Sequence, residues 1–417
     1  MELKNSGKTI SFFQRIVLQV PTIALSTLTM IAVSRNLGPT GRGEVSQILL
    51  LAAVTSNILC TPIFLTIMNL EVSSEIKSYI SSSLYLFSWK NLTFISLLNV
   101  CLIAFKKLGI HEFSAKLMVS INLLIAFYFI AAQIRDLLLK FHKNQIYGLD
   151  FLAQLMISGC VVALLVLNSS TVSHVIYVFV LTYGVNALVL LIVLKLKVRE
   201  FELIYLIRKR TLNPVSEGTR KIDSSFPMLG VLFQLSLSKD LLFGLFFLSK
   251  VDFGLMAALA SFWVVVRFFR PSAVIQVKVF QKQIDYSLRF PRGILGLMAR
   301  PSSVVYIQSV SIATMGIVGL VLTPVLMGGG FRPSNSMAIA GLTSEILLMK
   351  CLFDLSTSAS QFSQNSFLCL CLIQILILGI LSMIGYELSI SVIWFSSGLI
   401  YLIWLSMNKV RRKIESS

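Results

Sequence analysis

Charged residues are scarce in this sequence. Asp, Glu, Lys and Arg make up only 13% of its 417 residues, whereas about a quarter is usual in a soluble domain. Hydrophobic residues make up 56%. A water-soluble fold cannot hide so large an apolar fraction in its core, so the composition excludes a soluble globular protein.

Motifs of known catalytic and metal-binding sites are absent as well. The sequence contains no G-x-S-x-G, H-E-x-x-H, phosphate-binding-loop or dinucleotide-binding motif. Its three histidines are dispersed, and its six cysteines lie mostly inside apolar segments, where they act as small hydrophobic side chains. We therefore expect no catalytic residue, no bound metal and no cofactor.

Long apolar segments recur from end to end, and each is long enough to cross a hydrocarbon core of about 30 Å as a helix. They are continuously apolar, unlike the alternating strands of a membrane barrel. The sequence thus predicts an all-α polytopic membrane helix bundle of about twelve transmembrane helices. The predicted spans are 11–34, 44–70, 84–105, 114–136, 146–167, 171–194, 224–249, 252–275, 302–326, 334–356, 365–384 and 389–407.

Basic residues outnumber acidic ones, 36 to 18, which gives a net charge of +18. They lie between the apolar segments rather than in one stripe with interleaved aromatics, so we expect no nucleic-acid partner. With the N terminus in the cytoplasm, roughly 26 of the basic residues fall in or beside cytoplasmic segments and roughly 7 near the opposite side. This asymmetry predicts cytoplasmic N and C termini.

The longest hydrophilic stretch divides the chain into two lobes of about six helices each. The predicted lobes are residues 1–200 and 224–417, joined by a basic cytoplasmic linker at 201–223. The linker fits either an amphipathic helix on the membrane surface or an ordinary basic loop. A faint internal repeat supports two lobes, because S-R-N-L-G-P-T-G-R-G and S-K-V-D-F-G each follow the first helix of a lobe, ending at or near Gly43 and Gly254.

Two motifs resemble those of a known family. The turn R-N-L-G-P-T-G-R-G at 35–43 is similar to a family pattern R-x-L-G-P-x-G-x-G, and S-K-D-L-L-F-G at 238–244 is similar to R-x-D-x-x-L-L-G, with lysine next to the aspartate. Phe253-Gly254-Leu255, together with Ala257 to Ala260, is similar to a third pattern, G-x-Y-x-x-A, with methionine in place of the tyrosine. The sequence thus resembles the multidrug/oligosaccharidyl-lipid/polysaccharide (MOP) flippases, and within them the exporters of O-antigen and other polysaccharides.

This resemblance implies two six-helix lobes around a central cavity that opens alternately to each side of the bacterial inner membrane. It implies as substrate an undecaprenyl-pyrophosphate-linked oligosaccharide, and as partners membrane lipids, a coupling ion (H⁺ or Na⁺), a polysaccharide polymerase and a chain-length regulator. Two alternatives stay open. One is a cation-coupled drug exporter of the same architecture, and the other is a membrane polysaccharide polymerase or glycosyltransferase, which would need a larger extracytoplasmic loop.

Charged side chains inside predicted spans are functional candidates, because each is costly in hydrocarbon unless paired or solvated. Lys239 and Asp240 lie near the middle of a span, where they fit either a cavity wall that contacts the substrate or a structural ion pair. Glu345, Lys350 and Asp354 share another span. Lys350 and Asp354 are spaced to pair on one face, whereas Glu345 points roughly opposite Asp354. The carboxylates Asp240, Glu345 and Asp354, with Lys350, are candidates for ion coupling.

Arginines near the membrane surface are the remaining candidates for substrate binding. Arg267 and Arg270 share a helical face near the predicted cytoplasmic mouth, where they fit either a first contact with pyrophosphate or an anchor to lipid phosphates. Arg15 belongs to a polar stripe on the first helix that lines the cavity or contacts another helix. Arg35 begins the turn that carries the resemblance.

Overall fold

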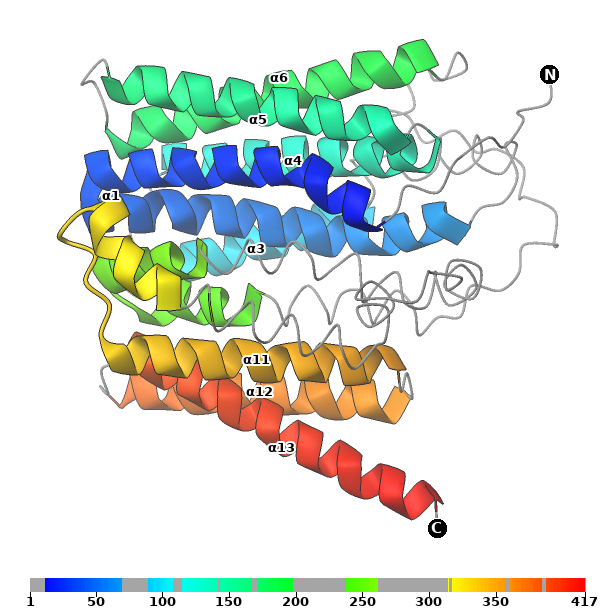
Figure 1. The fold of residues 1–417 in the computed structure, drawn as a ribbon, viewed down its shortest axis with the longest axis vertical. Helices are drawn as coiled ribbons and strands as arrows, with labels where there is room; N and C mark the ends of the chain where they lie inside the picture. Colours follow the sequence, from blue (N-terminus) through cyan, green and yellow to red (C-terminus); the bar gives the residue numbers. More distant parts are fainter. Residues whose placement is uncertain are drawn as a thin grey trace.

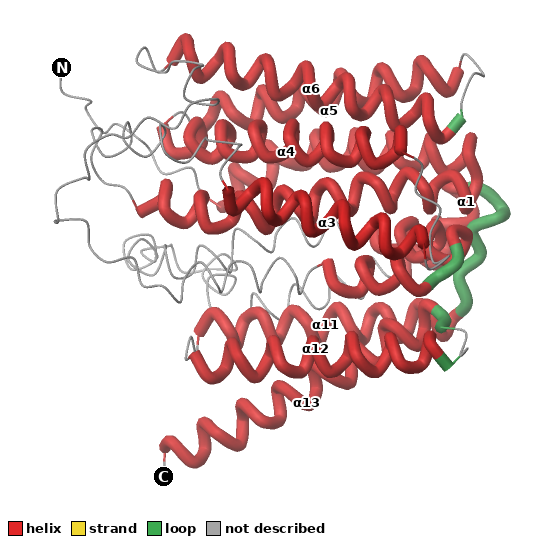
Figure 2. The backbone as a smooth tube through the Cα atoms, turned by 180° about the vertical axis from the view of Figure 1, so that it is seen from behind, coloured by secondary structure: helices red, strands yellow, loops and turns green. Residues whose placement is uncertain are grey.

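Every regular element in the described part of the chain is an α-helix, and the computed structural model contains no strand there (Figure 2). This confirms the predicted all-α fold class. The predicted linker at 201–223 lies outside the described residues. These are 12–69, 89–107, 115–141, 143–166, 171–197, 238–261, 314, 317–357, 361–384 and 388–416.

The long helices (Figure 1) follow the predicted spans in the described part of the chain, whereas the predicted spans 224–249, 252–275 and 302–326 lie only partly within it. The described residues 238–247, 250–261 and 317–327 are also helical. Within the described residues, six helices are long and apolar enough to cross a membrane, one of them comprising Pro21–Cys60. The chain is therefore a multi-pass membrane protein, while the total of about twelve spans stays a prediction. The long helices are α1 (Phe12–Asn69), α3 (Trp89–Lys107), α4 (Ala115–Phe141), α5 (Lys143–Val166), α6 (Val172–Lys197), α11 (Asn335–Thr357), α12 (Gln361–Met383) and α13 (Ile390–Ser416).

Helix α1 contains two of the predicted spans. A straight helix of 58 residues would be roughly 87 Å long, far more than a bilayer needs. Instead α1 folds back on itself (Figure 1) at Gly38, which has φ 67° and ψ −175°. Only glycine adopts that conformation readily. Pro39 follows, and its fixed φ and missing N–H suit the first position of the second helix. Where the sequence predicted an open turn over 35–43, the helix resumes directly after Gly38.

The long helices pack in two sets that follow the order of the sequence. In the N-terminal half, α1 packs against α4 and α5, and α6 packs against α4 and α5. In the C-terminal half, α13 packs against α11 and α12. Residues 238–261 and 317–327 (green and yellow) lie between the two sets, at the end of the bundle where α1 turns (Figure 1). Both views show α13 tilting away from α11 and α12 toward its C-terminal end.

Apolar side chains cover the outside of the bundle as well as its core. Large hydrophobic residues are exposed along α5, α6 and α12, among them Leu152, Leu188 and Leu376. In water such faces would be unstable, whereas in a bilayer they contact lipid. Aromatic rings fill the interior of the C-terminal half, where the rings of Phe367 and Trp404 meet edge to face with their centroids 5.5 Å apart.

Candidate functional site

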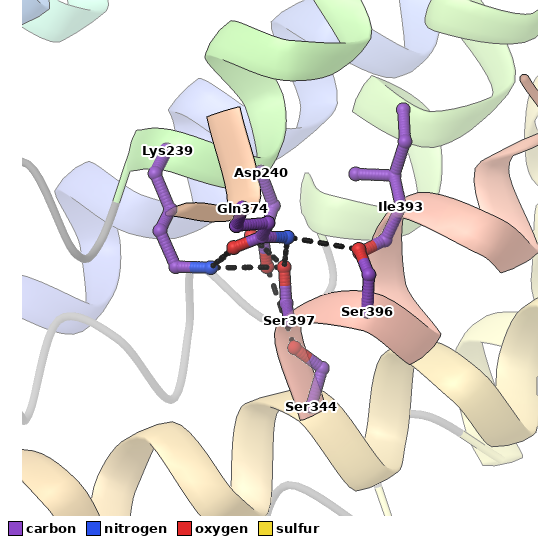
Figure 3. Close-up of polar contacts among 7 residues, drawn as sticks. All are labelled: Lys239, Asp240, Ser344, Gln374, Ile393, Ser396 and Ser397. Carbon is purple, nitrogen blue, oxygen red and sulfur yellow. Dashed lines mark hydrogen bonds and ion pairs between the residues drawn. The ribbon is translucent and has the colours of Figure 1, made fainter. Parts of the chain in front are cut away.

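A buried polar cluster lies inside the C-terminal half (Figure 3). At its centre the Lys239 ammonium donates to a carboxylate oxygen of Asp240 at 3.0 Å, to the amide oxygen of Gln374 at 2.8 Å and to the Ser397 hydroxyl at 2.9 Å. Lys239 is 6% exposed and Asp240 3%. An ammonium has three donors, so all three are satisfied within the cluster.

Asp240 is also well satisfied. Besides the bond from Lys239, its two oxygens accept hydrogen bonds from Ser397 at 2.5 Å and from Ser344 at 3.4 Å. Gln374 closes the network by donating to Ser397 at 2.7 Å and to Ser396 at 2.9 Å. A buried ion pair is tolerated only when its remaining lone pairs and protons are also bonded, and this network meets that condition.

Four helices build the cluster. Lys239 and Asp240 come from the helix at 238–247, Ser344 from α11, Gln374 from α12, and Ser396 and Ser397 from α13. Hydroxyl and amide side chains in apolar helices form interhelical hydrogen bonds because no water is available to them. The cluster therefore joins all four helices, and it lies wholly within the C-terminal half.

Tyr401 and Glu345 border the cluster. The Lys239 nitrogen lies 4.5 Å from the centroid of the Tyr401 ring, within cation–π range. The Tyr401 hydroxyl is buried without a hydrogen-bond partner among the described residues, and both Asp240 and Glu345 interact with it electrostatically. Glu345 is 1% exposed. Two carboxylates, one ammonium and one phenol thus occupy a single water-poor region.

Lys350 lies apart from the other described candidates for ion coupling. Lys350 is exposed on α11, whereas Glu345 on the same helix is buried. Asp354 lies in α11, but its side chain is not among those described, so its predicted pairing with Lys350 stays a prediction. Of the four candidates, the described side chains place Asp240 and Glu345 together and Lys350 apart from them.

Of the arginine candidates, the structure describes the side chain of Arg35 alone, and that side chain lies apart from the cluster. Arg35 is exposed and donates to the backbone carbonyls of Leu326 at 2.6 Å and Val325 at 2.9 Å, where the helix 317–327 ends. Those carbonyls lack partners within their own helix, so a guanidinium suits them. Arg15 lies in α1, but its side chain is not described, and Arg267 and Arg270 lie outside the described residues.

The two halves of the chain meet at the end where α1 turns. We call the contacts that residues 35–44 make with 250–261 and 325–330 the inter-half seam. A Cβ atom on Gly43 would overlap the carbonyl oxygen of Lys250, and a Cβ atom on Gly254 would overlap that of Pro39. These two contacts are reciprocal, because the offset that superposes Gly43 on Gly254 also superposes Pro39 on Lys250. Two parallel repeats related by an axis along the membrane normal would produce such a contact.

Polar contacts reinforce this glycine crossing. Glu44 and Lys250 form an ion pair at 2.6 Å, with about a third of each side chain exposed. Beside it, the Ser249 hydroxyl accepts from the backbone N–H of Asp252 at 3.1 Å and so caps the helix at 250–261. The seam thus combines backbone packing, one ion pair, the Arg35 bonds and a hydrogen bond from Arg42 to the Ser261 hydroxyl.

The sequence singles out Lys239 and Asp240, with an ion pair as one of two interpretations, but it does not indicate the residues that bond to them. Gln374 lies in the apolar run FLCLCLIQILILG, where an isolated amide indicates a buried hydrogen bond. Ser344 and Ser397 carried no usable signal, because serine is common in membrane helices. One feature of the sequence pointed to the seam, namely the two turns that end in Gly43 and Gly254. The sequence does not show that these glycines contact each other's half of the chain.

The fold is similar to that of solved transporter structures, whereas the sequence alone has no match. The sequence matches no known family model and no curated protein. The structure is similar to the inward-facing conformation of a multidrug resistance MATE family transporter of the MOP superfamily, with a TM-score of 0.54 at 11% identity, covering 95% of this chain and 98% of that one. It matches an outward-facing conformation of such a transporter with a TM-score of 0.49 at 13% identity, covering 98% and 97%. The first likeness shows that this chain has the fold of that transporter, as the resemblance of its motifs to the MOP flippases predicted.

Proposed function

We propose that this protein is an alternating-access transporter that moves an undecaprenyl-pyrophosphate-linked oligosaccharide from the cytoplasmic to the periplasmic leaflet of the bacterial inner membrane. The MOP-superfamily fold supports the transport mechanism, and the motifs at 35–43 and 238–244 support the polysaccharide-exporter branch. A sugar head group cannot cross hydrocarbon unaided, because it would lose many hydrogen bonds to water.

The observation that carries the proposal is the inter-half seam. Every seam contact described above lies at the end of the bundle where α1 turns, which the predicted topology places at the periplasm. A chain whose halves are joined at the periplasmic end corresponds to the state that accepts substrate from the cytoplasm. Separation of the seam would then release the substrate outward. A reporter fused within 327–333 is expected to score periplasmic and one fused after Ser417 cytoplasmic, which tests the side on which the seam lies.

The proposed coupling site is the buried cluster. Asp240 and Glu345 are the described carboxylates at this depth, and ionisable side chains inside a membrane protein commonly mark ion pathways. Binding of H⁺ or Na⁺ there would alter the bonds that join the four helices of the C-terminal half. Arg15, Arg35, Arg267 and Arg270 remain the proposed contacts for the substrate from the sequence.

One alternative function has an observation in its favour. The similar solved structure is described as a multidrug resistance transporter, and a cation-coupled drug exporter would also use the buried carboxylates Asp240 and Glu345. We prefer the anionic substrate because the described interior also holds the basic side chains of Lys239 and Arg42.

Deletion in the bacterium that makes the protein distinguishes the two. If the proposal is right, lipid-linked oligosaccharide accumulates and resists a sugar-cleaving enzyme supplied to the periplasm, as measured by mass spectrometry of extracted lipids. Plasmid-borne wild-type protein should restore export. An unchanged lipid-linked pool together with increased retention of cationic drugs would contradict the proposal and support the drug exporter.

A further inference from the structure

Arg42 is a buried arginine with poor partners. It lies at the inter-half seam, is 4% exposed and belongs to the second part of α1. One terminal nitrogen of its guanidinium approaches the Met30 sulfur, and the other donates to the Ser261 hydroxyl at 2.9 Å. Its Nε has no hydrogen-bond partner among the described residues. A sulfur and one hydroxyl are weak partners for a buried guanidinium, which normally has a carboxylate or phosphate beside it.

The direction of the Arg42 side chain is the second observation. Arg42 lies about one turn after Gly38, and side chains on a helix lean toward its N-terminal end, which here is the end at the membrane surface. An arginine so placed would ordinarily extend outward to water or lipid phosphates. Instead its guanidinium contacts Met30 and Ser261. Both residues lie deeper in the bundle than Arg42, because each is further from the turn at the end of its own helix. The fold thus holds this cation inside the protein.

Neighbouring buried groups on α1 are also donors without acceptors. The Ser46 hydroxyl lies one turn after Arg42 on the same face, and the side-chain nitrogen of Gln47 follows it. Both atoms are buried and have no hydrogen-bond partner in the described part of the chain. Unsatisfied buried polar atoms are rare and call for an explanation. N–H and O–H donors on the same helix as a buried guanidinium match the needs of an anion with several acceptor oxygens.

We propose that Arg42, with Ser46, binds the pyrophosphate of the transported lipid when the two halves of the chain separate at the seam. This inference rests on the proposed function for its ligand. Ser261 belongs to the C-terminal half, so separation breaks its bond to Arg42 and frees that side of the guanidinium. A phosphate oxygen then replaces the Ser261 hydroxyl, and the planar guanidinium accommodates two oxygens at once. Arg42 therefore exchanges a contact that joins the halves for one with the substrate.

Binding by the purified full-length protein tests the site. The probe is geranyl pyrophosphate, with geraniol as its uncharged counterpart, both titrated into protein in lipid nanodiscs. Arg42→Gln is expected to weaken geranyl pyrophosphate binding about tenfold or more, because it removes charged hydrogen bonds. Geraniol binding should not change. The matched control is Arg332→Gln, which makes the same substitution at an exposed arginine at the same end of the bundle and should bind like wild type.

Three results would overturn the site: wild-type protein that does not bind geranyl pyrophosphate, Arg42→Gln that binds it as wild type does, or equal losses in the Arg42 and Arg332 variants. If Arg42→Gln does not fold, Arg42→Lys decides, because it keeps the charge but loses the forked donor. It should weaken pyrophosphate binding severalfold, and unchanged affinity would reject Arg42 as the forked contact.

The deletion experiment separates this inference from the proposed function. If deletion leaves lipid-linked oligosaccharide unchanged while Arg42→Gln loses pyrophosphate binding, the anion site stands and the substrate is another phosphorylated lipid. If deletion causes accumulation while Arg42→Gln binds pyrophosphate normally, the flippase stands and the site does not.

Discussion

The two halves of the chain bury different polar side chains at equivalent positions of their helices. The offset of about 211 residues that superposes Gly43 on Gly254 also places Leu28 and Thr29 at the positions of Lys239 and Asp240. In the N-terminal half, Thr29 is buried and donates to the Ser158 hydroxyl at 2.7 Å. Ser158 in turn donates to the backbone carbonyl of Leu25 at 3.4 Å, so neutral hydrogen bonds join α1 to α5 there. The corresponding place in the C-terminal half holds an ion pair bonded to three further helices.

This difference indicates that the fold does not require charge at that position. A buried ion pair gains little stability over a neutral arrangement of similar volume, because both ions must be desolvated. The Thr29–Ser158 bond shows that a helix at this place can be held without one. We therefore propose that Lys239 and Asp240 serve the proposed transport cycle, in which the packing of the four helices that they join would change.

The largest effect is expected from breaking the ion pair on one side. Asp240→Ala leaves the Lys239 ammonium buried without its carboxylate, and we expect a loss of about 3–5 kcal/mol in the free energy of unfolding. Thermal unfolding of the purified protein, followed by size-exclusion chromatography, measures it. A melting temperature equal to that of wild type would show that water reaches the cluster.

A double substitution that copies the N-terminal residues into the C-terminal half tests this comparison directly. The double substitution Lys239→Leu with Asp240→Thr copies Leu28 and Thr29 into the C-terminal half. Because it removes both charges together, it should recover most of the stability that Asp240→Ala loses, and remain within about 2 kcal/mol of wild type. Export of lipid-linked oligosaccharide should nevertheless fail. Normal export by this variant, at normal protein level, would reduce the pair to a structural element.

The glycine crossing at the seam gives an intermediate effect. Gly43→Ala places a methyl group against the carbonyl of Lys250, which is backbone and cannot rotate away. We expect a loss of about 1–3 kcal/mol, as for other overpacked sites, and halves that separate more readily. Gly159→Ala is the matched control, since a Cβ atom at that helical position in α5 meets nothing within 4 Å. It should be neutral or stabilise by up to about 1 kcal/mol.

The melting temperatures of the two glycine variants test whether the halves pack through Gly43. In addition, a cysteine pair placed at Glu44 and Lys250 should cross-link more slowly in the Gly43→Ala background than in the Gly159→Ala background. Equal melting temperatures and equal cross-linking rates would mean that the halves do not pack through these glycines.

Much of the fold was predictable because hydrophobic runs in a membrane protein map directly onto helices. The predicted spans 114–136, 146–167 and 171–194 correspond to α4, α5 and α6 within a few residues. The hairpin within α1 was placed but its form was wrong, since helix geometry returns immediately after Gly38. Residues 34–43 look like a loop because of their glycines, whereas Pro39 in fact begins a helix.

The candidate site was only partly predictable, because sequence patterns show charge and depth but not partners. Lys239 and Asp240 stood out as charges in an apolar span. Gln374 and Ser397, which complete their hydrogen bonds, lie more than 130 residues later in the chain. Arg42 was hidden within a motif of turn residues, and nothing in its spacing indicates that its side chain turns inward.

The smallest effect is expected at the seam ion pair. Glu44 and Lys250 connect the halves at 2.6 Å, but about a third of each side chain is exposed, and exposed pairs contribute at most about 1 kcal/mol. Glu44→Gln should therefore barely change the melting temperature, in contrast to Asp240→Ala. A double-mutant cycle with Lys250→Gln should give a coupling energy below about 1 kcal/mol that falls as salt is added. The exchange of the two charges, Glu44→Lys with Lys250→Glu, should behave like wild type. A coupling energy of several kcal/mol, insensitive to salt, would mean that this pair is dry and that the seam holds the halves together by charge rather than by its glycines.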